Sequence, residues 1–494
     1  MDAECSNGCN RDEQSVLILK HFIAPHLLAG IGSYSEAEER SHSAIRELEL
    51  RGGAFSVYLI GAVYGNLAYI NLYSCTVTHE YNFAEYMKKS VEYYKQATVR
   101  ASSVTDASGA VGASGVSGVS GTVGPPASDI FKVADVRSYA CIVGEGAAPD
   151  EFDVILDAAK EASAYIAETP HKLYYGYDDL LACEIEYFKY KPDAARNHAN
   201  SAVMKARGAS QISIEVMAEQ YLLRIATLTG DYPLARELLN RLAGHLDNMN
   251  FWSRQLHYDL IIGLFFINIG LPELTPRWFA AEEKDATSEV HLTLRELVVS
   301  VKYHIALQQY DRALASLCKS FPREPHERTA FGELTLTLLL AVSKIKTGEE
   351  DGAVADFVKA YQLSYNGVFV TPFIELGKNL RPLTSAALKR PDCPIPVEWL
   401  KSVDLKASIY IKKTAVIMKS YMEDHKLTEA VRLSERELGV LKDLYHGLSR
   451  DEIAVNQYLS INTVKKILQS VFAKLDAKNS VDAIRIAIEK NLVD

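Results

Sequence analysis

The sequence predicts an all-α protein, in which an α-solenoid of helical hairpins is followed by a small four-helix domain at the C-terminus. Three observations support this fold class. Strand signals are scarce, whereas apolar residues recur at helical spacing along almost the whole chain. A unit made of a polar turn residue, small residues and an amphipathic run returns about every forty residues. Residues 431–494 depart from this period and carry their own helix-start and helix-stop signals.

Length and charge divide the chain in the same way. With 494 residues, the chain is too long for a single hydrophobic core. Its 48% hydrophobic and 23% charged residues are ordinary for a globular protein. The net charge of −10 argues against non-specific binding of nucleic acid or membranes by the molecule as a whole. Residues 431–494, however, hold ten Lys and Arg against nine Asp and Glu, so the negative charge lies in the rest of the chain.

The N-terminus and the cysteines indicate a cytoplasmic location. Seven cysteines are scattered along the chain, and no second pair joins Cys5 and Cys9 in a zinc site, so we expect free thiols. The first residues are acidic and polar, unlike a signal peptide. Residues 52–78 carry no formal charge, but they include Asn66, Asn71 and four tyrosines. These polar groups favour a buried pair of helices over a membrane span.

The forty-residue unit predicts a stack of two-helix hairpins. Six clear copies begin at residues 151, 191, 232, 272, 310 and 350, and two looser copies begin at residues 34 and 81. Several of the copies follow a short turn in which glycine supplies the left-handed residue that ends the preceding helix. Because one such hairpin cannot bury its apolar face alone, about eight hairpins should stack into a superhelix.

Two segments interrupt the repeats and suggest the domain boundaries. Residues 101–128 contain one charge, no aromatic residue, and glycine at every third position from 109 to 124. Six triplets without proline are too few for collagen, so we expect a disordered, flexible insert between helices. Prolines at 372, 382, 391, 394 and 396 end the repeats. We therefore assign residues 1–390 to the solenoid, 391–430 to a helical linker and 431–494 to the C-terminal domain.

The C-terminal domain is predicted to contain four helices. The expected N-terminal cap residues of the first three are Ser434, Ser449 and Ser460, and the fourth helix should begin near Ser480. A glutamate follows the first two of these serines at the three-residue spacing of a capping box. Gly447 should end the first helix. A short second helix, a tight turn and a third helix with basic residues near its start form a helix-turn-helix arrangement, in which the third helix fits the DNA major groove.

The third helix has one apolar and one polar face. The apolar face, which should pack inward, consists of Val464, Leu468, Val471 and Leu475. The candidate DNA-binding residues on or near the other side are Asn462, Thr463, Lys465, Lys466, Gln469 and Lys474. Ser460 at the cap of this helix, and Ser449 and Arg450 at the start of the second helix, complete the candidate set. Lysine can donate to guanine and glutamine can pair with adenine, so Lys465, Lys466 and Gln469 are the expected base readers. We expect Ser449, Arg450, Thr463 and Lys474 to face phosphates. The alternative is that these lysines form an ordinary solvated surface.

Residues 433–483 resemble the LuxR-type (GerE) helix-turn-helix domain. The matching blocks are LSERELGVL (433–441), GLSRDEIA (447–454), SINTVK (460–465) and KL (474–475), followed by Asn479 and Ala483. Four separate blocks at these spacings make the resemblance specific. It implies a four-helix DNA-binding domain that often dimerises through its last helix and reads two half-sites in promoter DNA.

This copy differs from the family pattern at four positions. Gln457 stands where the family usually has an aliphatic residue, which predicts a shifted or repacked second helix. Ile467 replaces a common histidine, and Asp476 replaces a common glycine. Ser480 stands where an arginine is frequent, which removes one possible phosphate contact.

The solenoid is similar to the effector-binding superhelix of MalT-like bacterial regulators. The similarity depends on the repeat length, on the order of the two parts and on the motif PFIELG at residues 372–377. It implies a tetratricopeptide-like (TPR-like) superhelix that senses an effector on its concave surface. No G-x4-G-K-[ST] motif is present, so no nucleotide cofactor is expected. No metal-ligand or catalytic constellation was found, and we therefore expect a protein that is not an enzyme.

Together these features predict a sequence-specific DNA-binding transcriptional regulator. Its solenoid would bind an unidentified small molecule or protein partner, and it would act on double-stranded DNA as a homodimer without contacting a membrane. The alternative is a protein-interaction scaffold whose degenerate helix-turn-helix serves only for dimerisation.

Overall fold

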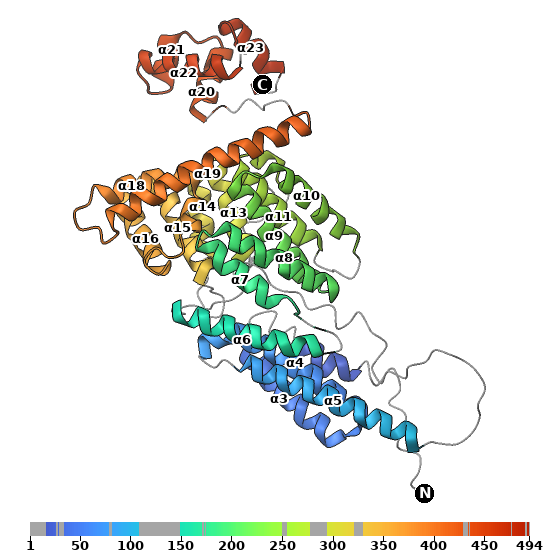
Figure 1. Ribbon diagram of the computed structural model, residues 1–494. Coiled ribbons are helices and arrows are strands. Elements are labelled where there is room, and N and C mark those ends of the chain that lie inside the picture. The colour runs from blue at the N-terminus through green and yellow to red at the C-terminus, as the bar shows by residue number, and fades with distance from the viewer. Residues whose placement is uncertain are drawn as a thin grey trace. The chain divides into compact units, whose positions relative to one another are not determined.

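The computed structural model of the protein is helical in every regular element that it describes (Figure 1). The described residues are 16–25, 28, 34–78, 82–107, 149–169, 172, 174–248, 254–276, 294–320, 330–427, 433, 435–475, 477–489 and 492–493. The chain divides into two compact units, Met1–Met418 and Lys419–Asp494. The predicted fold class, helical repeats followed by a small helical domain, is confirmed.

The first unit begins with helices that pack in chain order. They are η1 (Leu19–Ile23), α3 (Tyr34–Arg51), α4 (Gly53–Thr78), α5 (Phe83–Ala107) and α6 (Pro149–Glu168). Helix α4 is one continuous helix and not the expected pair, because no proline or turn sequence interrupts its apolar run. Gly61 lets α5 approach closely, since a Cβ there would lie 3.1 Å from the carbonyl oxygen of Ser90. Among the described helices, none combines the length and the hydropathy that a membrane crossing requires.

The predicted flexible insert begins later than the sequence suggested. Helix α5 continues to Ala107, so residues 101–107 are helical. These seven residues contain neither glycine nor proline, and the first glycine of the segment is Gly109. Residues 108–128 lie outside the described part of the chain.

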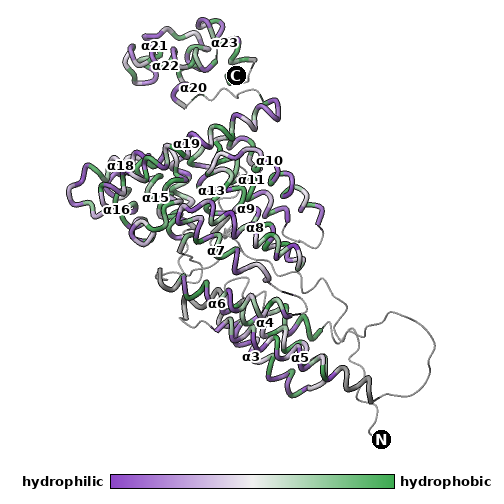
Figure 2. The backbone as a smooth tube through the Cα atoms, viewed as in Figure 1, coloured by the Kyte–Doolittle hydropathy of each residue, from purple (hydrophilic) through white to green (hydrophobic). Residues whose placement is uncertain are grey.

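Hairpin repeats follow these helices in the first unit. Their first helices are α7 (Tyr177–Phe188), α9 (Ile212–Thr229), α11 (Arg254–Ile269), α13 (Leu294–Ala306) and α15 (Ala330–Thr347). Their second elements are α8 (Pro192–Gly208), α10 (Tyr232–Gly244) with η3 (His245–Asp247), η4 (Pro272–Leu274), α14 (Tyr310–Ser320) and α16 (Glu350–Leu363). The copy predicted from residue 272 is seen only as the short η4, and residues 277–293 lie outside the described part. Most of these helices carry both hydrophobic and hydrophilic residues (Figure 2), whereas α9 is buried along nearly its whole length.

The turn within each of these hairpins contains the same hydrogen bond. The amide that follows a left-handed residue donates to the carbonyl five residues earlier and so closes the first helix. The donor–acceptor pairs are Lys191–Glu186, Asp231–Ala226, Leu271–Phe266, Gln309–His304 and Glu349–Lys344. Glycine is the left-handed residue in three of the turns, but Tyr190 and Gln308 occupy it in the other two, with φ of 60° and 62°. The period is therefore a property of the turn geometry and not of glycine alone.

The last elements of the first unit pack against its repeats. They are α17 (Thr371–Ile374), η6 (Gly377–Asn379), α18 (Leu380–Leu388) and α19 (Val397–Asp424). Trp399 of α19 contacts Tyr361 and Phe373 edge-on, with ring centroids 4.9 Å apart in both pairs. Its indole nitrogen donates to the carbonyl of Gly367 at 3.2 Å. Residues 397–417, part of the segment expected to be a linker, thus contribute buried side chains to the first unit.

A buried polar cluster joins helices that are far apart in the sequence. Arg224 of α9 and Glu375, just after α17, form an ion pair of 3.0 Å, and their side chains are only 6% and 5% exposed. The Tyr187 hydroxyl donates to Glu375 at 2.6 Å, and Lys302 Nζ lies 3.7 Å from the same carboxylate. The Thr371 hydroxyl donates to the backbone carbonyl of Tyr187. The PFIELG segment therefore occupies part of the face lined by α7, α9 and α13.

Apart from the end of α19, the described residues of the second unit form four helices, three of which pack against α22. They are α20 (Glu435–Tyr445), α21 (Arg450–Asn456), α22 (Ile461–Leu475) and α23 (Ser480–Glu489). One buried cluster consists of Leu441, Val471, Leu475, Ala483, Ala487 and Val493. The other consists of Val440, Ile453, Ala454, Val464 and Leu468. Helix α22 contributes to both clusters, so it is the central helix of the unit.

Candidate nucleic-acid interface

Helix α21 begins with the predicted capping box. The Ser449 amide donates to the Glu452 carboxylate at 2.8 Å, and the Glu452 amide donates to the Ser449 hydroxyl at 3.4 Å. The hydrogen bond from the Ser449 backbone lowers the pKa of Glu452, because it favours the charged carboxylate. Arg450, the first residue of the helix, is exposed. The equivalent capping box at Ser434 lies outside the described residues.

The turn between α21 and α22 is short and tightly bonded. The Leu459 amide donates to the carbonyl of Ala454 at 2.8 Å, which closes α21. Tyr458 adopts the left-handed conformation with φ of 54°, and its side chain is 96% exposed. The Thr463 amide then donates to the hydroxyl of Ser460 at 3.1 Å, so Ser460 caps α22 as predicted.

Helix α22 has the two faces that its sequence predicted. The buried residues are Val464, Leu468, Val471 and Leu475, all at most 3% exposed. The exposed residues of the predicted reading face are Asn462, Lys465, Lys466 and Gln469. In the described part of the chain, neither Lys465 nor Lys466 is engaged in an ion pair or hydrogen bond. Their ammonium groups are therefore available to an external acceptor.

Two of the predicted phosphate contacts already have partners within the domain. Thr463 is half-buried, and its hydroxyl lies 2.8 Å from that of Ser460 in the cap of α22. Lys474 Nζ lies 2.6 Å from a carboxylate oxygen of Glu437, whose side chain is only 10% exposed. The Ser470 hydroxyl donates to the other oxygen of Glu437 at 2.7 Å. The sequence did not indicate this link between α20 and α22.

Gln457 is accommodated by a second buried acid. The Asp443 carboxylate accepts a hydrogen bond from Gln457 at 2.7 Å and one from Asn456 at 2.9 Å. Asp443 is 8% exposed, so these two donors compensate its burial. Gln457 thus links the C-terminal end of α21 to α20 through a polar contact. Asp443 and Gln457 belong to different helices, so their pairing depends on how α20 and α21 pack.

Two of the remaining departures from the family pattern lie in the described part of the structure. Ile467 is partly buried and packs against both core clusters. Helix α23 starts at Ser480 as expected, although its cap is Asn479, whose side chain accepts from the Asp482 amide at 3.0 Å. Asp476 lies outside the described residues.

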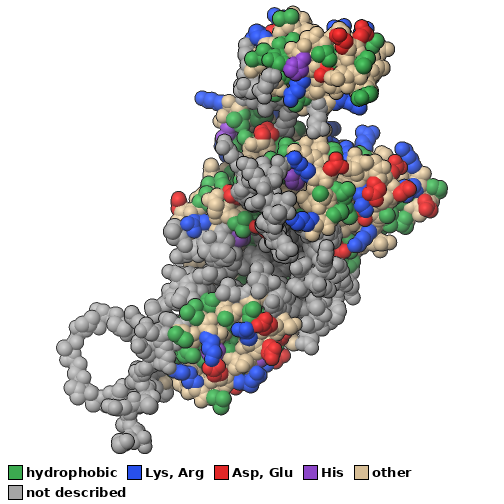
Figure 3. All heavy atoms as spheres, turned by 180° about the vertical axis from the view of Figure 1, so that it is seen from behind, with side chains coloured by type: hydrophobic (Ala, Val, Ile, Leu, Met, Phe, Trp, Pro, Cys, Tyr) green, Lys and Arg blue, Asp and Glu red, His purple; other side chains and the backbone are tan. Residues whose placement is uncertain are grey.

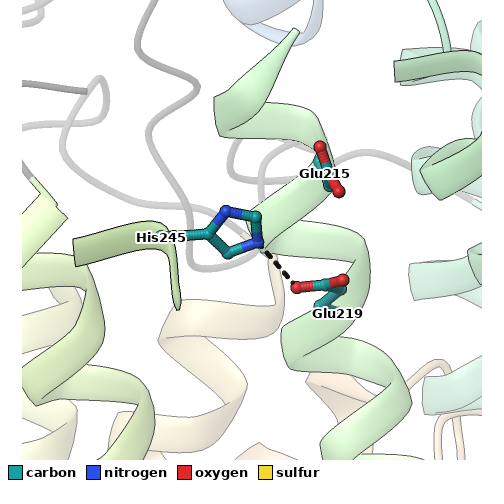
Figure 4. A group of neighbouring side chains, drawn as sticks. All are labelled: Glu215, Glu219 and His245. Atoms are coloured by element: carbon teal, nitrogen blue, oxygen red, sulfur yellow. Dashed lines mark hydrogen bonds and ion pairs between the residues drawn. The ribbon is translucent and has the colours of Figure 1, made fainter. Parts of the chain in front are cut away.

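One group of side chains in the first unit has the composition of a metal site (Figure 4). Glu215 and Glu219 lie on successive turns of α9, and His245 Nε2 is 2.9 Å from Glu219. Arg207 lies 2.7 Å from Glu215 and 3.5 Å from Glu219, and Arg241 lies 3.8 Å from Glu219. Two guanidinium groups thus already balance the two carboxylates, so we assign this cluster a structural role.

The fold and this interface define a class of protein. A short capped helix, a tight turn and a second helix with a capped, exposed and basic N-terminal half constitute a helix-turn-helix DNA-binding domain. Residues 431–487 match the family model described as bacterial regulatory proteins, LuxR family. This match confirms the resemblance drawn from the sequence for the C-terminal domain, and such a domain implies a DNA-binding transcription regulator.

A curated relative is also similar to part of the chain. It is the response regulator protein VraR of Staphylococcus saprophyticus subsp. saprophyticus, with 28% identity over 131 residues. The match covers 26% of this chain and 62% of the relative's length. The similarity is thus limited to a minor part of the chain.

Proposed function

We propose that this protein is a sequence-specific transcriptional regulator that places α22 in the major groove of promoter DNA. The observation that carries the proposal is the exposed N-terminal half of α22, where Lys465 and Lys466 are free of partners in the described part of the chain. A helix whose polar face only contacts solvent would not require a capped helix and a tight turn before it.

The proposal assigns distinct roles to the exposed residues. Lys465, Lys466 and Gln469 read base edges, where lysine donates to guanine O6 and N7 and glutamine pairs with adenine. Arg450 and the serine caps Ser449 and Ser460 lie at helix N-termini, where backbone amides and the helix dipole favour phosphate. Asn462 and Thr463, on the first turn of α22, belong to the same contact surface.

In this proposal the first unit is a sensor. Its helical repeats bind a small molecule or a protein partner, as the similarity to MalT-like regulators suggests, and binding changes the access or the pairing of the DNA-binding domains. On the face drawn in Figure 3, Lys and Arg side chains of the described residues are interspersed with Asp and Glu. A surface of this kind favours a specific effector over non-specific attraction to nucleic acid.

The second candidate function is a scaffold that uses the helix-turn-helix for dimerisation. The observation in its favour is that Val481 and Ile488 of α23 are 78% and 50% exposed. The same two side chains could mediate a dimer on DNA. Failure to select a DNA sequence is therefore the observation that distinguishes the scaffold from the regulator.

The test is in vitro selection of randomised DNA duplexes by the full chain, by residues 425–494 alone and by the full-length Lys465→Ala/Lys466→Ala variant. We expect an enriched, two-fold-symmetric site that the variant fails to enrich. Enrichment by residues 425–494 but not by the full chain would mean that the first unit blocks binding until its effector is present. No enrichment by either form would favour the scaffold.

A further inference from the structure

Helix α20 carries two buried acids, and each is bonded to a different helix of the helix-turn-helix. Glu437 and Asp443 are both 8% exposed. Asp443 holds the end of α21 through two side-chain amides, as described above. Glu437 holds α22, because one of its oxygens accepts from Ser470 and the other from Lys474. Removing a carboxylate from water is unfavourable unless hydrogen-bond donors replace the lost hydration. These bonds therefore offset the cost of burying the two acids.

The position of this link on α22 is important for DNA recognition. Ser470 and Lys474 are one helical turn apart in the second half of α22. Of the proposed base readers, Lys465 and Lys466 lie in the first half, and Gln469 directly precedes Ser470. Apolar packing of Val464, Leu468, Val471 and Leu475 determines which side of α22 faces inward, but it is not directional. Hydrogen bonds to Glu437 are directional, so they restrict rotation and sliding of the helix on α20.

We propose that Glu437 is a positioning residue for α22 and that Lys474 acts through this ion pair, without contacting a phosphate. The inference rests on the proposed DNA-binding function and deepens it. It revises the role that the sequence suggested for Lys474. Lys474 is 42% exposed and its ammonium is bonded at 2.6 Å to a buried carboxylate, so moving to a phosphate would leave that carboxylate with one fewer partner.

Salt dependence separates the two roles of Lys474. A lost phosphate contact reduces the slope of log Kobs against log salt by about 0.9, whatever the DNA sequence. We therefore compare Lys474→Met with the unaltered full chain, using the selected site and a scrambled duplex. For Lys474→Met we expect an unchanged slope and a fall of about tenfold or more in the ratio of specific to non-specific affinity. A slope reduced by about 0.9 with an unchanged ratio would overturn the proposal.

Two further measurements guard against a merely structural effect. A variant with a smaller folded fraction binds every DNA sequence more weakly by the same factor, so its ratio of specific to non-specific affinity is unchanged. A change in this ratio therefore reports on the positioning of α22. Lys474→Arg should restore the ratio, because a guanidinium can also donate to Glu437. Failure of Lys474→Arg to improve on Lys474→Met would contradict the assignment.

The last measurement does not need DNA. Hydrogen exchange of the α22 amides in the full chain should accelerate in Glu437→Gln and in Lys474→Met, and the double variant should add little to either change. Additive changes would mean that the two residues act independently, which would refute the link. If the unaltered chain selects no DNA sequence while exchange shows the coupling, the proposed function fails and the positioning of α22 by Glu437 stands.

Discussion

At the scale of single residues, Glu375 shows how opposing effects determine one ionisation state. Burial alone would raise the pKa of Glu375, but the charges of Arg224 and Lys302 and the hydrogen bonds from Tyr187 and Arg224 outweigh it. Its pKa is therefore lower than the ordinary value of 4.5, and the carboxylate is charged at neutral pH. A buried ion pair of this kind is weak evidence for net stability, but removing one partner leaves a buried charge uncompensated.

This residue predicts a specific pH dependence of unfolding. Because the folded-state pKa is depressed, the stabilisation from Glu375 is fully present above the unfolded-state pKa and is lost as the pH falls through the folded-state pKa. Glu375→Gln should lower the free energy of unfolding at pH 7 by about 3 kcal/mol. Urea unfolding should show this difference shrinking as the pH falls below about 5. A difference that is constant over that range would contradict the charge-based explanation.

Lys465 and Lys466 provide a second prediction at the residue scale. A lysine that reads a base affects one position of the site, whereas a lysine that contacts phosphate affects all sequences equally. Lys465→Ala should cost about 1–3 kcal/mol at one base-pair position and relax selection there. Competition binding with single-base variants of the selected site measures this. Unchanged selectivity would remove Lys465 from the reading face.

At the scale of elements, the end of α21 depends on a polar contact where the family usually has an apolar one. Asp443 of α20 accepts hydrogen bonds from both Asn456 and Gln457. The polar residue Gln457, which stands where the family usually has an aliphatic residue, therefore has a polar partner on α20. The two positions are fourteen residues apart and belong to different helices. Only the packing of α20 on α21 brings them together.

A double substitution tests this pairing. Asp443→Leu alone leaves the Gln457 amide without its acceptor and should lower the free energy of unfolding by about 1–3 kcal/mol. Adding Gln457→Leu should recover most of this loss, because both partners are then apolar. Denaturant unfolding of the two single variants and the double variant gives the coupling energy. A double variant as unstable as the sum of the singles would argue against the direct contact.

The turns of the hairpins lead to a prediction for glycine. Gly230 has φ of 78° and lies between α9 and α10, and a Cβ there would be 2.7 Å from Lys413 Cδ. Gly230→Ala should therefore lower the free energy of unfolding by about 1–2 kcal/mol. Gly208→Ala is the matched control, since Gly208 is helical and no atom lies within 4 Å of its Cβ position. Equal effects of the two variants in thermal unfolding would contradict the role of the left-handed turn.

At the scale of the whole molecule, each compact unit has a hydrophobic core of its own. The core of the second unit comes from α20 to α23, and the PFIELG segment and α19 contribute to the packing of the first unit. A chain of this kind is expected to unfold in more than one step. Calorimetry of the full chain should resolve at least two transitions, and Leu468→Ala should lower only one of them. A single transition that shifts as a whole would mean that the two units unfold together.

The sequence by itself determined the helices, the period of the repeats and which face of α22 is exposed. These features depend on local spacing, such as the serine caps, the left-handed turn residues and the four apolar residues on one side of α22. The main errors were also local. Residues 53–78 form one helix where two were expected, and α5 extends seven residues into the predicted insert.

Only the tertiary structure decided which polar groups are paired. Arg224 meets Glu375 across 151 positions and Lys474 meets Glu437 across 37, and neither separation corresponds to a helical or turn period. Such partners are chosen by the angle and distance at which packed helices meet, and many alternative pairings would satisfy the same charges. For this reason the sequence indicated Lys474 as a phosphate contact, whereas the structure shows it bonded to a buried carboxylate.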